Sequence, residues 1–135
     1  MKKALSLISK IYEKGNRFII NQLNRNGIEG LVPSHGDILA VLYKYEKATM
    51  NDIAKKIHRT KPTVTVLVDK LERLGFVQRE KSSQDNRITY ISLTQKGKSF
   101  EAIFKQISED LNSFLYKNLT SEEAETLDAL LEKMQ

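Results

Sequence analysis

Asp85 and Arg87 are the residues of this sequence whose types and spacing first indicate chemistry. They end a polar segment that favours turns, and a β-prone run, Ile88 to Leu93, follows directly. An arginine at a narrow tip can enter the minor groove of DNA, where negative potential is enhanced over A·T-rich steps. Asp85 would repel phosphate, so we expect it to orient an arginine through a charge-assisted hydrogen bond. A surface ion pair without function is the alternative.

A second β-prone run, Phe76 to Lys81, precedes the polar segment, so the two runs predict a hairpin with a long polar tip. A hairpin alone is marginally stable in water, and it must therefore pack against another element. At and beside its tip the residues expected to contact DNA are Lys81, Ser82, Ser83, Asp85, Asn86 and Arg87.

The segment from Pro62 to Gly75 predicts a helix with one buried apolar stripe. Proline suits a first helical turn, so Lys61 is expected just outside the helix, and Gly75 is suited to end it in a left-handed turn. The exposed face of such a helix has the shape and chemistry to read the major groove. Its expected contact residues are Thr60, Lys61, Pro62, Thr63, Thr65, Val66, Asp69, Lys70 and Arg73.

These residues divide by chemistry. Thr65 suits a base edge or a phosphate, and the basic side chains of Lys61, Lys70 and Arg73 suit phosphates. Val66 is apolar at the centre of a polar face, where it would fit against a thymine methyl group. The alternative is that Val66 is one harmless exposed valine.

A shorter helix is expected in "MNDIAKKIH", with Thr49 or Asn51 near its start. Two short helices joined by a turn and followed by a hairpin make a winged helix-turn-helix, in which the hairpin is the wing. His58 falls in the turn between the helices, and we expect it to adopt the backbone angles of that turn rather than to bind a ligand. The predicted fold class is mainly α (α+β).

Helices are expected on both sides of this unit. One covers Lys3 to about Asn26, weakened in its middle by Gly15, and another begins at Ser34 as N-cap with Asp37 three residues on. A long helix is expected to start at Thr94, and a last one at the capping box formed by Thr120 and Glu123. The predicted organisation is one compact chain with an N-terminal helix and linker at 1–33, the winged region at 34–94 and C-terminal helices at 95–135.

The apolar stripes of the two ends, Leu5 to Leu23 and Phe100 to Met134, exceed what one small core needs. A single winged module also contacts few base pairs. Both points favour a two-fold dimer in which helices from the two ends interlock, so that two wings read half-sites about one DNA turn apart. Packing of the stripes within one monomer is the alternative.

Charge is concentrated in the middle of the 135-residue chain. Asn51 to Lys98 holds 11 basic and 5 acidic residues, a local net charge of +6, whereas the remainder holds 11 basic and 12 acidic residues. Such asymmetry is typical of a nucleic-acid-binding surface, since neutralising phosphates releases counterions. A solvated basic surface is the alternative.

Several classes of function are disfavoured. The chain has no cysteine, which excludes disulfides, thiol switches and cysteine-based metal sites, and its two histidines are scattered. No nucleotide-binding or hydrolase motif is present, so we expect no enzyme, cofactor or metal. No apolar run is long enough for a membrane span and no secretory signal is evident, so a cytoplasmic location is expected.

The segments "TKPTVTVLVDKLERLGFVQRE" and "DNRITYISLTQKG" together resemble the MarR family of bacterial winged-helix transcription regulators. The family pattern DxR, a strand and LTxxG is matched by Asp85, Arg87, Leu93, Thr94 and Gly97. The resemblance covers essentially the whole chain and implies a cytoplasmic homodimer on a pseudo-palindromic operator in double-stranded DNA, with the wing arginine in the minor groove.

The chain also departs from the family pattern. His58 stands where the turn commonly has glycine, and Val66 where an arginine is often found, so its base preference is expected to differ from that of typical members. The family further implies a small aromatic or phenolic effector, often an aromatic acid. By position, the residues expected to line its site are Tyr12, Phe18, His35, Tyr43 and Tyr45, with core packing as the alternative for each.

The leading hypothesis is therefore a homodimeric, sequence-specific DNA-binding regulator, expected to be a ligand-responsive repressor. A winged-helix module that binds protein and no longer binds DNA is the alternative from another class. The local charge of +6 and the basic hairpin tip argue against it. A small enzyme ranks third, because only isolated acids and hydroxyls are available.

Overall fold

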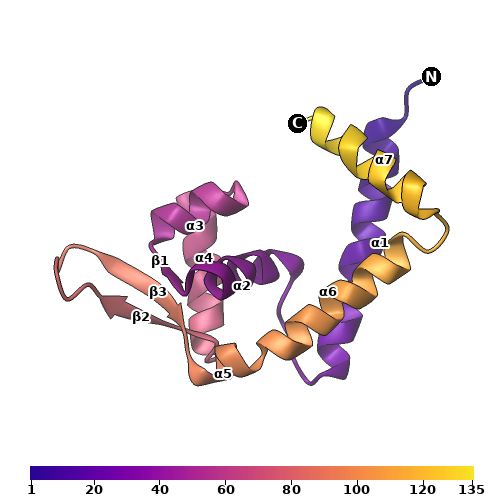
Figure 1. The fold of residues 1–135 in the computed structure, drawn as a ribbon. Helices are drawn as coiled ribbons and strands as arrows, with labels where there is room; N and C mark the ends of the chain where they lie inside the picture. The colour runs from indigo at the N-terminus through magenta and orange to yellow at the C-terminus, as the bar shows by residue number, and fades with distance from the viewer.

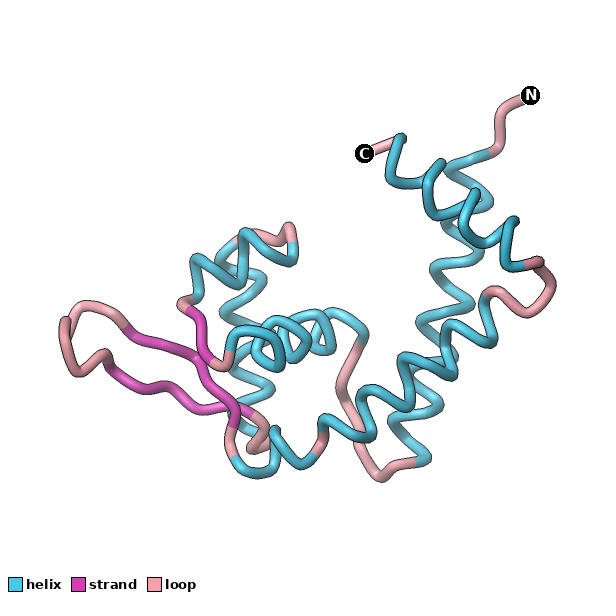
Figure 2. Tube along the Cα trace, viewed as in Figure 1, coloured by secondary structure: helices cyan, strands magenta, loops and turns pink.

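The computed structural model describes residues 1–135 and divides into two lobes joined through a loop and a helical segment (Figure 1). The helices of one lobe come from the two ends of the chain: α1 Ala4–Arg25, α6 Glu101–Leu115 and α7 Ser121–Lys133. The other lobe contains all the strands (Figure 2), and its elements are α2 Pro33–Tyr45, β1 Lys47–Ala48, α3 Met50–Ile57, α4 Lys61–Arg73, β2 Val77–Lys81, β3 Thr89–Leu93 and α5 Gln95–Ser99. The predicted class, mainly α with a winged helix-turn-helix, is confirmed. No helix has the length and apolar content that crossing a bilayer requires.

Helix α1 runs without interruption through Gly15, which the sequence marked as a weak point. Gly15 is buried there, and a Cβ atom added to it would meet Leu111 and Leu115 of α6 at 3.8 Å. One turn further on, Phe18 stacks on Phe114 with ring centroids 4.6 Å apart. Packing against α6 therefore sustains the helix where its local propensity is low.

The start of α2 differs from the expectation. Ser34 is not the N-cap, because the helix begins at Pro33, whose missing N–H and preset φ suit the first position. The N–H of Val32 donates instead to Nδ1 of His35 at 2.9 Å. Burial lowers the pKa of His35, which favours the neutral imidazole that this hydrogen bond needs. The reciprocal cap expected from Asp37 is thus replaced by one from histidine.

The turn between α3 and α4 is close to its prediction. Thr49 caps α3, and His58 holds the left-handed conformation expected of it, at φ 57°. Lys61 was expected outside α4 but is its first residue. The N-cap is Thr60, whose hydroxyl oxygen accepts from the N–H of Thr63, so the helix starts one residue earlier than the proline suggested.

The sheet has three antiparallel strands in the order β1-β3-β2, so the predicted hairpin has a third partner. Strand β1 has only two residues, too few to leave a sequence pattern. The hairpin register pairs Val77 with Leu93 and Arg79 with Ile91. Val77, Ile91 and Leu93 are buried, so this face of the sheet joins the core of the lobe. That core also includes the fully buried residues Ile38, Leu42, Ile53, Val64, Val68 and Leu71.

The long helix expected after Thr94 is divided into α5 and α6 at Phe100. Helical hydrogen bonds still run on both sides, from the N–H of Phe100 to the oxygen of Lys96 and from the N–H of Phe104 to the oxygen of Phe100. The Phe100 ring is buried edge-on against Phe76, with centroids 5.3 Å apart. The division therefore falls where the C-terminal helix passes from the wing base to the other lobe.

The base of the hairpin is held by close backbone contacts. Gly75 ends α4 at φ 84°, as predicted, and its carbonyl oxygen accepts from the hydroxyl of Thr94. The N–H of Thr94 donates to the oxygen of Phe76 at 3.1 Å. A Cβ atom at Gly97 would lie 2.1 Å from that same oxygen. The threonine and glycine that follow the second strand therefore fix where the hairpin leaves the core.

Gly97→Ala should destabilise the protein by about 1–3 kcal/mol, because the added methyl group overlaps backbone that cannot move aside easily. Urea unfolding at fixed protein concentration measures this. Gly15→Ala is the matched control: its Cβ has ordinary contacts only and lies in a helix, so the stability should stay equal or rise. Equal stabilities for the two variants would contradict the role given to Gly97.

Candidate nucleic-acid interface

The basic middle third of the sequence forms α3, α4, the hairpin and α5, which all belong to one lobe (Figure 1). Lys61 and Arg73 of α4 and Lys81 of the wing are exposed and form no ion pair within the chain. Their positive charge is therefore available to an anionic partner.

Helix α4 is buried and exposed on the faces that the sequence predicted. Val64, Val68 and Leu71 are fully buried against α2, α3 and the sheet. On the opposite side Val66 has 68% of its surface exposed. The exposed residues of α4 are Lys61, Pro62, Thr63, Val66, Asp69, Glu72 and Arg73.

The threonines at the start of α4 bond within the helix. The hydroxyl of Thr60 donates to the Oγ1 of Thr63 at 3.0 Å while it caps the helix. The hydroxyl of Thr65 donates to the carbonyl oxygen of Lys61 at 2.9 Å. Thr65 is therefore not a free donor in the unbound chain, whereas the hydroxyl proton of Thr63 is uncommitted.

Asp69 has a structural partner that the sequence did not reveal. Its carboxylate accepts from the guanidinium of Arg79 on β2, and the same guanidinium lies 3.3 Å from Glu72, one turn further along α4. Arg79 thus ties the wing to α4. Asp69 and Glu72, at i and i+3 on one helix, indicate in the sequence that a cation could bind between them. Nothing in the sequence shows that this cation is Arg79.

Lys70 does not lie free beside the exposed face. Its ammonium nitrogen is 2.8 Å from the position a Cβ atom would take at Gly30, in the loop between α1 and α2. Its charge is also one of the effects that lower the pKa of His35, after burial. A phosphate contact by Lys70 stays a prediction.

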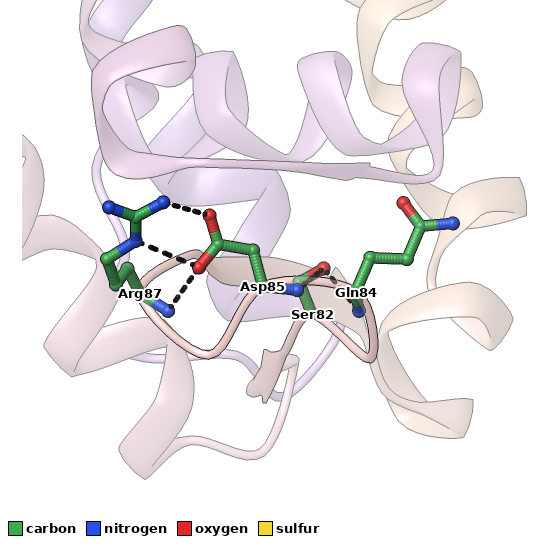
Figure 3. A network of polar contacts seen from close by, with 4 residues as sticks. All are labelled: Ser82, Gln84, Asp85 and Arg87. Atoms are coloured by element: carbon green, nitrogen blue, oxygen red, sulfur yellow. Dashed lines mark hydrogen bonds and ion pairs between the residues drawn. The ribbon is translucent and has the colours of Figure 1, made fainter.

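The wing tip forms the network shown in Figure 3. Asp85 accepts from the backbone N–H of Arg87 at 3.0 Å and from its guanidinium through Nε at 3.1 Å and Nη2 at 3.0 Å. The hydroxyl oxygen of Ser82 accepts from the N–H groups of Gln84 and Asp85. Ser83 and Asn86 are exposed at the same tip. The orienting role expected of Asp85 has the geometry it needs.

This ion pair lies at the outermost part of the hairpin. The side chain of Arg87 is 90% exposed, so nothing but Asp85 holds it in position. The hydrogen bonds from Arg87 lower the pKa of Asp85 and raise that of the arginine, so both groups stay charged at neutral pH. The arginine side chain is therefore exposed at the tip while Asp85 holds its guanidinium.

Asp85→Ala should weaken DNA binding roughly two- to tenfold, because the freed arginine must be ordered on binding. Simple charge counting predicts the opposite sign, since the change removes a negative charge next to phosphates. Fluorescence anisotropy with a labelled duplex decides between them. Tighter binding by the variant would contradict the orienting role.

Three of the residues expected to line an effector site have structural contacts. The hydroxyl of Tyr43 donates to the carbonyl oxygen of Gly97 at 2.8 Å, and burial raises its pKa to about 12. His35 caps α2, and Phe18 stacks on Phe114. Each of them contributes to the core or to a helix end.

The other two lie at the surface and line neither of the two cavities described in this section. Tyr12 is exposed on α1. Tyr45 is exposed between the ammonium groups of Lys44 and Lys56, which lie 5.3 and 4.3 Å from its ring centroid. Among the five residues only Tyr43 lines a large cavity, a polar one of about 480 Å³ beside the outer face of the sheet. The structure therefore does not bring the five residues together.

An apolar cavity of about 200 Å³ lies elsewhere, between α1, α2 and α6. Asp37 is the charged residue of its wall, and burial raises the pKa of that carboxyl. The sequence reading missed this cavity because its lining comes from three helices distant in sequence. Its apolar walls include Ile19, Leu23, Leu39, Phe104, Ile107 and Leu111.

Comparisons with known proteins agree with this architecture. A model of the MarR family matches residues 31–89. YwhA, an HTH-type transcriptional regulator of Bacillus subtilis, is 28% identical over 78% of this chain and 80% of its own length. YkoM, another such regulator from Bacillus subtilis, is 30% identical over 77% of this chain and 68% of its own length.

Solved structures extend the match to nearly the whole chain. The Staphylococcus aureus MepR–DNA complex superposes with a TM-score of 0.87 and 30% identity over 99% of this chain and 97% of MepR. A mutant of MarR from Escherichia coli complexed with operator DNA gives a TM-score of 0.81 and 26% identity over 96% and 91%.

The fold, with a capped helix exposed beside an arginine-tipped wing, defines a winged helix-turn-helix protein. The chain belongs to the MarR family. This family consists of transcription regulators.

Proposed function

We propose that this chain acts as a homodimeric, sequence-specific DNA-binding transcription regulator. In each subunit α4 enters the major groove and the wing enters the minor groove of one operator half-site. The observation that carries this is the exposed Arg87, oriented by Asp85 at the tip of a wing that Arg79 ties to α4. Readout of both grooves requires such a fixed spacing between a helix and a basic tip.

The related structures support the same function, since the S. aureus MepR and E. coli MarR structures described above are complexes with DNA. A repressor acting in the bacterial cytoplasm fits this function. A regulator of this kind needs no catalytic chemistry, and we ascribe none to the chain.

The dimer is supported by apolar surface at the two ends of the chain. Leu5 of α1 is 82% exposed and Leu130 of α7 is 54% exposed. Tyr12, Leu127 and Met134 are also exposed, although they lie on the stripes that a single core would bury. Surface of this kind on a soluble chain marks an association site, and the interlocking of two such ends accounts for it.

Arg87→Ala should weaken binding to the preferred duplex roughly five- to hundredfold and leave folding intact, since the side chain is 90% exposed and its hydrogen bonds and ion pair are with Asp85. Lys81→Ala should weaken binding to preferred and scrambled duplexes alike, and lower the slope of log affinity against log salt by about 1. The duplex comes from binding-site selection, and affinities are measured across a salt series.

Arg17→Ala is the matched control for these variants. It removes an exposed arginine from α1, outside the proposed interface, and should leave DNA binding unchanged. An Arg87→Ala protein that binds like the parent would contradict the wing contact. Absence of binding to every selected duplex at low salt would favour a winged-helix module that binds protein instead of DNA.

Effector response is a second part of the proposal, supported by the apolar cavity between α1, α2 and α6. The cavity lies between the helices of the two lobes, so a bound molecule can change how the lobes are held. Its single charged wall residue, Asp37, is an acid. This chemistry suits a neutral phenolic or aromatic compound better than the aromatic acid expected from family resemblance.

The matched pair 2-naphthol and 2-naphthoate tests this by isothermal titration. We expect the neutral phenol to bind more tightly than the acid, and its binding to lower the affinity for DNA. Ala40→Phe places a large side chain in the wall of the cavity and should abolish binding of 2-naphthol. Tighter binding of the acid, or an unaffected variant, would contradict the assignment of the cavity.

A further inference from the structure

The exposed face of α4 offers few polar groups for reading bases. The carboxylate of Asp69 is engaged by Arg79, and the hydroxyl of Thr65 donates to the carbonyl oxygen of Lys61. Thr60 is committed to the helix cap. Near the start of the face, Thr63 keeps one free hydroxyl proton. Hydrogen-bond readout by this helix is therefore restricted before DNA is present.

What the face does offer is apolar surface. Val66 is 68% exposed and lies two turns or less from each of the exposed cations Lys61 and Arg73. Pro62 is exposed one turn before Val66. An exposed apolar side chain between phosphate-binding cations does not stabilise the unbound protein. It does match the one apolar group that base pairs present in the major groove. That group is the C5 methyl of thymine.

We propose that Val66 is a specificity-determining residue that reads a thymine methyl group in each operator half-site. This inference rests on the proposed DNA-binding function and deepens it. The valine side chain is rigid at χ1, so little conformational entropy is lost when it packs against a methyl group. Cytosine lacks this methyl group at C5, and uracil differs from thymine by this group alone.

The test combines base and side-chain changes in a double-mutant cycle. Each thymine of the selected duplex is replaced in turn by uracil, which removes only the methyl group. For the parent protein, a single uracil at one particular position of a half-site should weaken binding about fourfold. This is the effect of losing one buried methyl-sized group. For Val66→Ala, the same substitution should cost less than twofold, because the partner of the methyl group is gone.

Val66→Thr is the matched control, since it keeps the shape of valine and replaces one methyl group by a hydroxyl. It should retain part of the sensitivity to uracil, and only at the position where the parent protein is sensitive. Because Val66 is exposed within a helix, Val66→Ala should melt at the same or a slightly higher temperature than the parent and Val66→Thr close to it, which is checked by thermal melting.

The possible results distinguish a failure of the methyl contact from a failure of the proposed DNA-binding function. Tight, sequence-specific binding with no uracil position that costs more than twofold would overturn the methyl contact and leave the DNA-binding function standing. Equal uracil sensitivity in the parent and in Val66→Ala would overturn it as well. A parent protein that binds no duplex at low salt would overturn both.

Discussion

The position of the wing depends on the contact between Gly97 and the carbonyl oxygen of Phe76, which leaves no room for a side chain. The same oxygen accepts from the N–H of Thr94, whose hydroxyl donates to Gly75 at the end of α4. The end of α4, the base of the hairpin formed by β2 and β3, and the start of α5 therefore meet at one point. Movement of any of these elements would change the distance between α4 and the tip, on which the proposed readout of two grooves depends.

Polar contacts then refine a geometry that the backbone sets. Arg79 joins β2 to Asp69 of α4, but a partly exposed ion pair of this kind contributes at most about 1 kcal/mol. The ion pair acts mainly by orienting the two elements, because it holds strand β2 against helix α4 on the side that faces solvent. Asp85 does the same for Arg87 at the tip, where no packing is available. Acids that repel phosphate thus serve a DNA-binding surface by positioning its cations.

The features that could be predicted from the sequence are those whose partners are close along the chain. Thr49 caps its helix through a residue three positions on, and Asp85 pairs with Arg87 two positions away. The bond between Asp69 and Arg79 could not be predicted, because Arg79 belongs to another element, and the DNA contact expected of Asp69 stays a prediction. The apolar cavity could not be predicted from the sequence for the same reason, since its walls come from three separate helices. Side chains that meet through tertiary packing leave no local signal.

In the proposed function, two copies of one helix-and-wing unit bind one duplex together. Hydroxyl-radical footprinting on a selected operator tests this arrangement. We expect two symmetric sets of protected sites with centres about one helical turn apart. Each set should include a minor-groove patch that Arg87→Ala removes, while the protection of the backbone that flanks the major groove remains. A single asymmetric patch, or protection that does not depend on Arg87, would contradict the account.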